Sequence, residues 1–133
     1  MAELKQFHYK GKTIEELKKM DINEFANLVD SRIRRSLKRG FTDAQKKLMI
    51  KIEKTFKSER KKPIKTHCRD MIILPDFVGM RIHVYDGKSF VDLTIQEEMI
   101  GHLLGEFAPT RKRLKHGTAG VGATKSSAAV SKK

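Results

Sequence analysis

The carboxylates of this sequence end at Glu106, and that boundary limits where a hydrophobic core can form. The 27 residues after it carry seven Lys or Arg, no Asp or Glu, and an end rich in Gly, Ala and Ser. Such a segment has too few apolar side chains to pack, and its positive charge repels itself until a polyanion neutralises it. The sequence therefore predicts a folded body followed by a flexible basic tail over residues 108–133.

Charge is unevenly divided over the rest of the chain. The 133 residues hold 29 Lys or Arg against 16 Asp or Glu, a net charge of +13. Residues 70–106 carry seven carboxylates against Arg81 and Lys88, a net charge of −5, so the two flanks together carry +18. A chain of this charge attracts polyanions, which makes nucleic acid the first partner expected. The acidic middle is suited to facing a basic protein.

Length and hydrophobicity limit the fold to one modest core. Hydrophobic residues make up 38% of the chain, enough for one domain once the tail is excluded. No run of about 18 apolar residues is present to span a bilayer, and the opening residues lack the apolar run of a signal peptide. The one cysteine, Cys68, has no internal disulfide partner, which fits a reducing compartment. We expect a cytosolic protein that does not insert into a membrane.

The first sixty residues have helical signals. Three pairs of residues resemble N-terminal caps ahead of apolar residues at helical spacing. These pairs are Thr13 with Glu16, Asp21 with Glu24, and Thr42 with Gln45. Gly40 supplies a stop just before the cap at Thr42. The pattern predicts a helical hairpin over residues 1–60, with a long first helix and its turn at residues 40–41.

Five basic residues crowd the end of that predicted long helix. They are Arg32, Arg34, Arg35, Lys38 and Arg39. Any single one of them can be a solvent-exposed charge that favours the C-terminal end of the helix dipole. Because five lie within eight residues, we expect at least one contact with a phosphate.

The helical pattern ends at Pro63, and the sequence then becomes β-branched and turn-punctuated. Residues 71–74 predict a first strand. Residues 80–85 and 88–95 flank Asp86-Gly87, a strong hairpin signal. A two-residue turn there places Ile82 opposite Val91 and Arg81 opposite Asp92, with the aliphatic residues on one face. A brief helix over residues 97–104 follows. The predicted class is α+β, with the helical hairpin packed on a small three-stranded sheet.

Signals for catalysis or metal binding are weak. Residues 117–126 resemble a phosphate-binding loop, but Ala123-Thr124 separate Gly122 from Lys125, and no strand precedes them. The five histidines and Cys68 lack the paired spacing of a zinc site. The sequence therefore predicts neither an enzyme, nor a metal site, nor a cofactor.

Several motifs occur in the order found in one known family. They are residues 65–75 (KTHCRDMIILP), 78–79 (VG), 84–88 (VYDGK), 99–107 (MIGHLLGEF), 115–117 (KHG) and 120–127 (GVGATKSS). This series resembles the small-subunit ribosomal protein family numbered nineteen. The helical N-terminal part resembles the extension of its archaeal and eukaryotic branch, whose eukaryotic form is numbered fifteen. Asp76-Phe77 stands where that family's pattern favours Glu-Met.

The resemblance implies a structural RNA-binding protein in the head of the small ribosomal subunit. Such a protein contacts the 3′ domain of small-subunit rRNA, lies beside ribosomal protein thirteen and extends its tail toward the tRNA sites. Carried onto this chain, the rRNA-facing residues are Lys65, His67, Arg69, Arg111, Lys112, Arg113, Lys115 and His116. The division it suggests is a helical extension over residues 1–60, an rRNA-binding body over 61–107 and the tail.

The complete set of candidate residues combines charge with resemblance. The RNA-binding candidates are the five helix residues above, Lys61, Lys62, the eight residues of the resemblance and Lys125. The candidates for a basic protein partner are Asp76, Asp86, Glu97 and Glu98. Two alternatives remain open, a generic DNA-coating or chromatin protein and an RNA-processing enzyme. Equal binding of duplex DNA and rRNA identifies the first, and turnover abolished by one side-chain change identifies the second.

Overall fold

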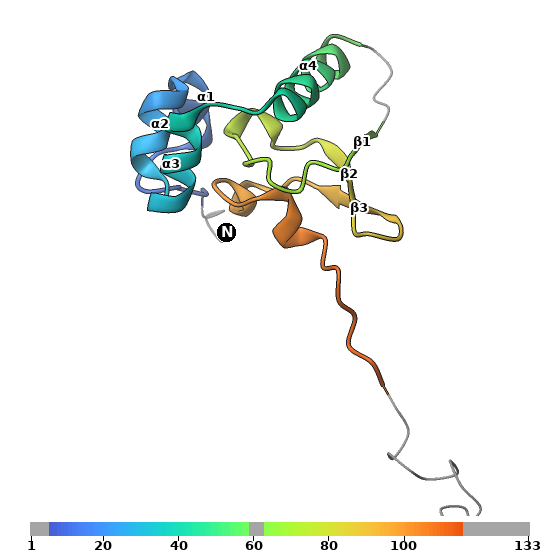
Figure 1. The fold of residues 1–133 in the computed structure, drawn as a ribbon. Helices are drawn as coiled ribbons and strands as arrows, with labels where there is room; N and C mark the ends of the chain where they lie inside the picture. The colour runs from blue at the N-terminus through green and yellow to red at the C-terminus, as the bar shows by residue number, and fades with distance from the viewer. Residues whose placement is uncertain (1–5, 59–62, 116–133) are drawn as a thin grey trace, which may run out of the picture.

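The computed structural model describes residues 6–58 and 63–115, and these form an α+β fold (Figure 1). Within these residues lie four α-helices, three strands and three 3-10 turns. The helices are α1 (Ile14–Lys19), α2 (Ile22–Leu28), α3 (Ser31–Arg39) and α4 (Asp43–Lys57). The strands are β1 (Ile64–Thr66), β2 (Arg81–Tyr85) and β3 (Phe90–Thr94), and the 3-10 turns are η1 (Pro75–Phe77), η2 (Glu97–Met99) and η3 (Leu104–Phe107). The predicted class is confirmed.

The helix caps at Thr13 and Thr42 form as the sequence predicts, whereas Asp21 precedes α2 without a side-chain cap hydrogen bond. The Thr13 amide donates to Glu16 Oε2 at 2.9 Å, and the Glu16 amide donates back to Thr13 Oγ1 at 3.4 Å. Thr42 and Gln45 form the same reciprocal pair at the start of α4. Each pair satisfies two backbone donors that have no partner inside the helix.

The predicted long first helix is wrong, because the chain breaks between α2 and α3. Val29 and Asp30 are extended, with ψ of 167° and 156°. Val29 is 1% exposed, so the break turns its side chain into the core. The helices α1 to α3 form one group, and α4 lies apart from it (Figure 1). The helical part is therefore a three-helix group followed by α4, instead of a simple hairpin.

The strand predicted at residues 71–74 is also wrong. β1 lies earlier and pairs in parallel with β2, which pairs antiparallel with β3. Residues 71–74 are all buried and form backbone bonds to the 101–105 segment, such as the Ile73 amide to the His102 carbonyl at 2.8 Å. Gly101, with φ of +81°, takes part in this pairing, since its amide donates to the Ile73 carbonyl at 3.1 Å. It also divides the predicted 97–104 helix into η2 and η3.

The hairpin lies where the sequence predicts it, with a register shifted by two residues. Ile82 pairs with Leu93 and Val84 with Val91. The Asp86 carboxylate accepts from the amides of Lys88 and Ser89 at 2.8 and 2.7 Å, which moves the turn centre to residues 87–88. A shift of two keeps every side chain on its face. The predicted aliphatic face therefore survives.

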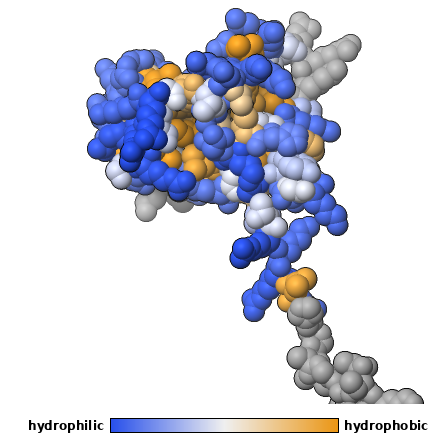
Figure 2. All heavy atoms as spheres, in the orientation of Figure 1, coloured by the Kyte–Doolittle hydropathy of each residue, from blue (hydrophilic) through white to orange (hydrophobic). Residues whose placement is uncertain are grey.

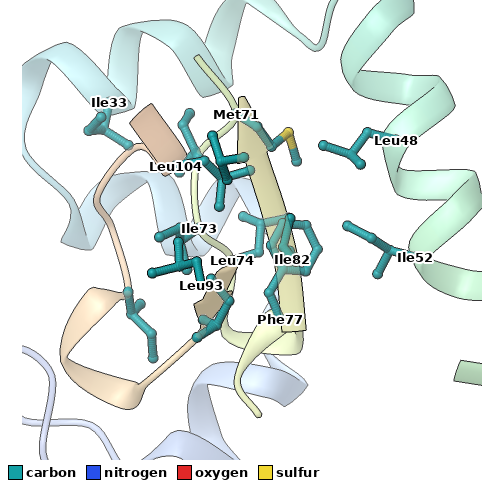
Figure 3. Packing of buried hydrophobic residues seen from close by; sticks show 14 of the residues in the cluster. Ile33, Leu48, Ile52, Met71, Ile73, Leu74, Phe77, Ile82, Leu93 and Leu104 are labelled. Carbon is teal, nitrogen blue, oxygen red and sulfur yellow. The ribbon is translucent and has the colours of Figure 1, made fainter. Parts of the chain in front are cut away.

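One face of the sheet is covered by the core. Leu48 and Ile52 of α4 pack near Ile82 and Met71, and all four are at most 3% exposed (Figure 3). Among the described residues, none of the helices is long and apolar enough to cross a bilayer. Because the core lies on one side of the sheet, the opposite face meets solvent.

Candidate nucleic-acid interface

The solvent-facing side of the sheet carries polar and aromatic residues. Ile64, Thr66, Ile82 and Val84 are buried on the core side. Successive residues of a strand point to opposite faces, so their neighbours point outward. Lys65 pairs with His83, His83 with Asp92, and Tyr85 with Phe90. We call this surface the outer face.

Three aromatic rings meet on the outer face. The ring centroid of His67 lies 4.6 Å from that of Tyr85 and 5.2 Å from that of Phe90, and the Tyr85 and Phe90 rings lie 5.2 Å apart. The Nζ of Lys65 lies 5.4 Å from the centroid of Phe90, within cation–π distance. These three rings, called the aromatic cluster below, combine flat apolar surfaces with an adjacent cation.

A groove of about 480 Å³ runs between α4 and β1, and three lysines line it. They are Lys51 and Lys54 of α4 and Lys65 of β1. Sequence reasoning identified Lys65 and missed the other two, although a spacing of three already places Lys51 and Lys54 on one side of a helix. Lys61 and Lys62, also predicted to bind RNA, lie outside the described residues. This lysine groove adjoins the aromatic cluster through Lys65.

The described start of the tail is exposed and basic. Arg111, Lys112, Arg113 and Lys115 are all exposed, and this segment leads away from the body (Figure 1) with a mainly hydrophilic surface (Figure 2). Hydrogen bonds from the Ser89 and Lys88 amides hold the pKa of Asp86 below its usual value, and the nearby charge of Lys112 lowers it further. Lys112 of the tail is therefore close enough to the hairpin turn for its charge to act on the Asp86 carboxylate. His116 and Lys125 lie outside the described residues.

Arg69 has its guanidinium turned toward the protein itself. Its Nη1 donates to the Tyr85 carbonyl at 2.6 Å, and its Nη2 donates to the carbonyls of Gly105 and Ala108 at 2.9 and 2.6 Å. A Cβ on Gly105 would lie 2.9 Å from the Arg69 carbonyl oxygen, so glycine is required for this approach. The geometry indicates that Arg69 joins β2 to the start of the tail.

The basic residues of α3 divide into two groups. Arg34 donates from Nε to the Ala26 carbonyl at 3.1 Å and from Nη2 to the carbonyls of Asn27 and Val29 at 3.3 and 3.1 Å. It thereby satisfies backbone acceptors at the end of α2. Arg32 and Arg39 line a hollow of about 440 Å³ near the start of α4, while Arg35 and Lys38 are exposed. Four of the five residues thus remain available to an outside partner.

The carboxylates of the outer face have partners within the chain. Asp92 forms an ion pair with Arg81, and the Nε2 of His83 lies 3.3 Å from Asp92 Oδ1. The hydrogen bond from Arg81 holds the pKa of Asp92 below its usual value. Asp86 accepts from the hairpin turn, as described above. These acids therefore present less uncompensated negative charge to a polyanion than their number indicates.

The other three predicted partner residues, Asp76, Glu97 and Glu98, are exposed. Asp76 lies on a groove of about 390 Å³ whose apolar lining comes from α4, η1 and the residue before η1. That lining consists of Met49, Ile52, Phe56, Leu74 and Phe77. Phe56 is 59% exposed, and hydrophobic surface is visible over α4 (Figure 2). We call this the apolar groove.

No three His, Cys, Asp or Glu side chains come together as a possible metal site within residues 6–58 and 63–115. Cys68 is half-buried, and its amide donates to Thr66 Oγ1 at 3.0 Å.

Comparisons with known proteins agree on one family. The family model described as ribosomal protein S19 matches residues 35–116, which include α4, the sheet and the start of the tail. A curated relative, small ribosomal subunit protein uS19 of Saccharolobus solfataricus, is 52% identical over 127 residues, covering 94% of this chain and 90% of the relative. The family match leaves α1 and α2 outside, whereas this relative covers nearly the whole chain.

Proposed function

The chain belongs to the ribosomal protein S19 family, and from that premise we propose that it binds the 3′ head domain of small-subunit rRNA. A structural role in the small ribosomal subunit follows from the family. One observation supports our finer proposal most strongly, namely that the lysine groove and the aromatic cluster adjoin on a sheet whose other face is closed by the core. Cations beside exposed rings suit RNA, which offers phosphates and base surfaces together.

The proposed mechanism is release of counterions from rRNA phosphates. Each phosphate neutralised on a duplex lowers the logarithm of the binding constant by roughly 0.9 per tenfold rise in salt. The tail adds further cations. The conformational entropy that is lost when the tail becomes ordered is compensated only when the tail binds RNA. We expect the tail to extend toward the tRNA sites, and we place the protein in cytoplasmic ribosomes.

The residues proposed to contact RNA follow from their exposure. Described residues in this set are Arg32, Arg35, Lys38, Arg39, Lys51, Lys54, Lys65, His67, Arg111, Lys112, Arg113 and Lys115. Lys61, Lys62, His116 and Lys125 remain predictions. We assign Arg34 and Arg69 to positioning, because their guanidinium groups already donate to backbone carbonyls of this chain.

Binding across a salt series tests the proposed function. The full chain is titrated with the 3′ head domain of small-subunit rRNA, an unrelated structured RNA and duplex DNA. We expect a preference for the head-domain RNA that persists at high salt, because shape-specific contacts remain when phosphate contacts are screened. Equal affinities with parallel salt slopes would contradict the proposal and favour a generic nucleic-acid-coating protein.

We further propose that a basic neighbour, ribosomal protein thirteen, docks at the acidic surface that includes Asp76 on the apolar groove. The charged residues of the lining are Asp76 and Glu53 against Lys18. An apolar floor with an excess of acid on its lining suits a protein segment that presents both apolar and basic side chains. Asp76→Lys, alone or with Glu97→Lys and Glu98→Lys, should weaken that pairing several-fold in a pull-down titration. Affinity for rRNA should stay unchanged or rise.

The matched control for this experiment is Glu24→Lys on α2, which changes the charge equally at an exposed position on a helix that does not line the groove. Asp86 is left unchanged, because its carboxylate holds the hairpin turn together. A pairing constant unaltered by the triple reversal would contradict this assignment. We also infer that the protein has no catalytic turnover, and turnover abolished by one side-chain change would overturn that inference.

A further inference from the structure

The outer face carries more aromatic surface than packing requires. A sheet covered on one side needs apolar residues on that side alone, and the core side is already filled by Ile82, Val84 and Leu93. Nevertheless His67, Tyr85 and Phe90 meet on the outer face with centroids 4.6 to 5.2 Å apart. His67 is exposed, and the other two rings are half-buried. The cluster therefore offers a partly open aromatic surface to a ligand.

Cations surround this surface on the side of the lysine groove. Lys65 contributes to both features, with its Nζ 5.4 Å from the Phe90 centroid and its side chain on the groove. Lys51 and Lys54 extend the positive charge along α4. If a ligand placed a flat ring on the aromatic cluster and a neighbouring phosphate on the lysine groove, both groups would lie beside complementary partners.

Acidic residues near the cluster do not prevent such a ligand from binding. Asp92 is paired with Arg81, and Asp86 accepts from its own turn with Lys112 nearby. Each carboxylate thus has a cation close to it, so the negative charge is locally compensated. The cations of the lysine groove have no acidic residue among the residues that line the groove with them.

We propose that the aromatic cluster is a stacking site for an unpaired RNA base, with the phosphates of the same strand on the lysine groove. This inference rests on the proposed rRNA-binding function and adds a contact that charge does not supply. Bases inside a duplex have both faces covered by their neighbours, whereas unpaired bases stack on aromatic side chains with little dependence on base identity. The ligand class is therefore a single-stranded or looped-out nucleotide.

Tyrosine fluorescence tests the stacking directly, because the chain has two tyrosines and no tryptophan. In a Tyr9→Phe background, the full chain reports only Tyr85. We expect a short single-stranded oligoadenylate to quench this emission and a duplex RNA of equal length to leave it nearly unchanged. Phe90→Leu should weaken oligoadenylate binding about tenfold without altering the salt slope, since stacking is not ionic.

Control variants separate stacking from charge and from folding. Phe90→Tyr should restore affinity, whereas Lys65→Gln should reduce the salt slope by about 0.7, as expected for one single-strand phosphate. His67→Ala changes an exposed ring and should also weaken binding at constant slope. Circular dichroism verifies that each variant is folded, and His67→Ala serves if Phe90→Leu is not.

The same variants on head-domain rRNA distinguish two kinds of failure. If the parent chain prefers head-domain RNA but Phe90→Leu and His67→Ala bind oligoadenylate as the parent does, without quenching of Tyr85, the stacking site is wrong and the proposed function stands. If the parent chain shows no preference for head-domain RNA, the proposed function itself fails. Quenching together with aromatic-dependent affinity supports the stacking site.

Discussion

At the scale of single residues, arginine has two different uses in this chain. Arg111 and Arg113 are exposed on the tail, whereas the guanidinium groups of Arg34 and Arg69 donate to backbone carbonyls. A sequence shows the charge but not the acceptor, because the carbonyls that Arg69 reaches lie 16 to 39 residues away. Most of the basic residues predicted to bind RNA are exposed, and their RNA contacts stay a prediction, whereas sequence reasoning did not foresee the backbone contacts of Arg34 and Arg69.

Arg69→Ala should destabilise the fold while Arg111→Ala does not. The first change leaves three carbonyls without their charged donor. A hydrogen bond to a charged group contributes a net of roughly 1.5 to 3 kcal/mol to stability, and water that reaches the freed carbonyls offsets part of the summed loss. We expect a loss of about 3 kcal/mol in the free energy of unfolding, measured by urea denaturation. An unchanged urea midpoint for Arg69→Ala, with a fall in rRNA affinity, would show that Arg69 acts at the RNA instead.

Acid should weaken the hairpin through Asp86. Backbone hydrogen bonds from Ser89 and Lys88 lower the pKa of this carboxyl in the folded chain. A depressed folded pKa adds stability above the unfolded value, and that stability is lost as pH falls below about 4 and through the folded pKa. Asp86→Asn should therefore flatten the acid side of the stability curve. A carboxyl resonance of Asp86 that titrates at the ordinary pH in NMR would contradict this account.

At the scale of elements, structural features that depend on neighbouring residues were predicted better than features that depend on contacts farther along the chain. The caps at Thr13 and Thr42 and the aliphatic face of the hairpin depend on neighbouring residues, and they form as expected. At the break near Val29, Arg34 donates to backbone carbonyls that have lost their helical partners. The hairpin register depends on Asp86 accepting from the turn. In both cases a side chain forms a hydrogen bond with the backbone, and the hydrophobic periodicity of the sequence does not reveal such a bond.

Arg34→Ala should loosen the junction of α2 and α3. Three carbonyls at the end of α2 lose their donor, so we expect a cost of about 1 to 2 kcal/mol in the free energy of unfolding. Arg35→Ala is the matched control, since Arg35 is exposed on the same helix. Hydrogen exchange should accelerate locally in α2 for Arg34→Ala. Equal exchange rates in the two variants would refute this role.

At the scale of the whole molecule, the fold separates a closed core from an outer face that joins distant segments. The aromatic cluster draws on residues from 67 to 90, and the lysine groove combines α4 with β1. Sequence reasoning could not predict that the aromatic cluster and the lysine groove adjoin. Their adjacency depends on β1, whereas the first strand was predicted at residues 71–74, and on the hairpin register, which is shifted by two residues. Composition alone did predict that nucleic acid is the partner, and the family supports that conclusion.

Lysine footprinting tests the central claim, that the outer face, the lysine groove and the tail contact rRNA. The full chain is acetylated lightly, free and bound to head-domain rRNA, and each lysine is quantified by mass spectrometry. We predict that Lys51, Lys54, Lys65 and Lys112 lose reactivity on binding, whereas Lys18 and Lys19 of α1 keep it. Protection of Lys18 and Lys19, with Lys51, Lys54 and Lys65 as reactive as in the free chain, would contradict the proposed interface.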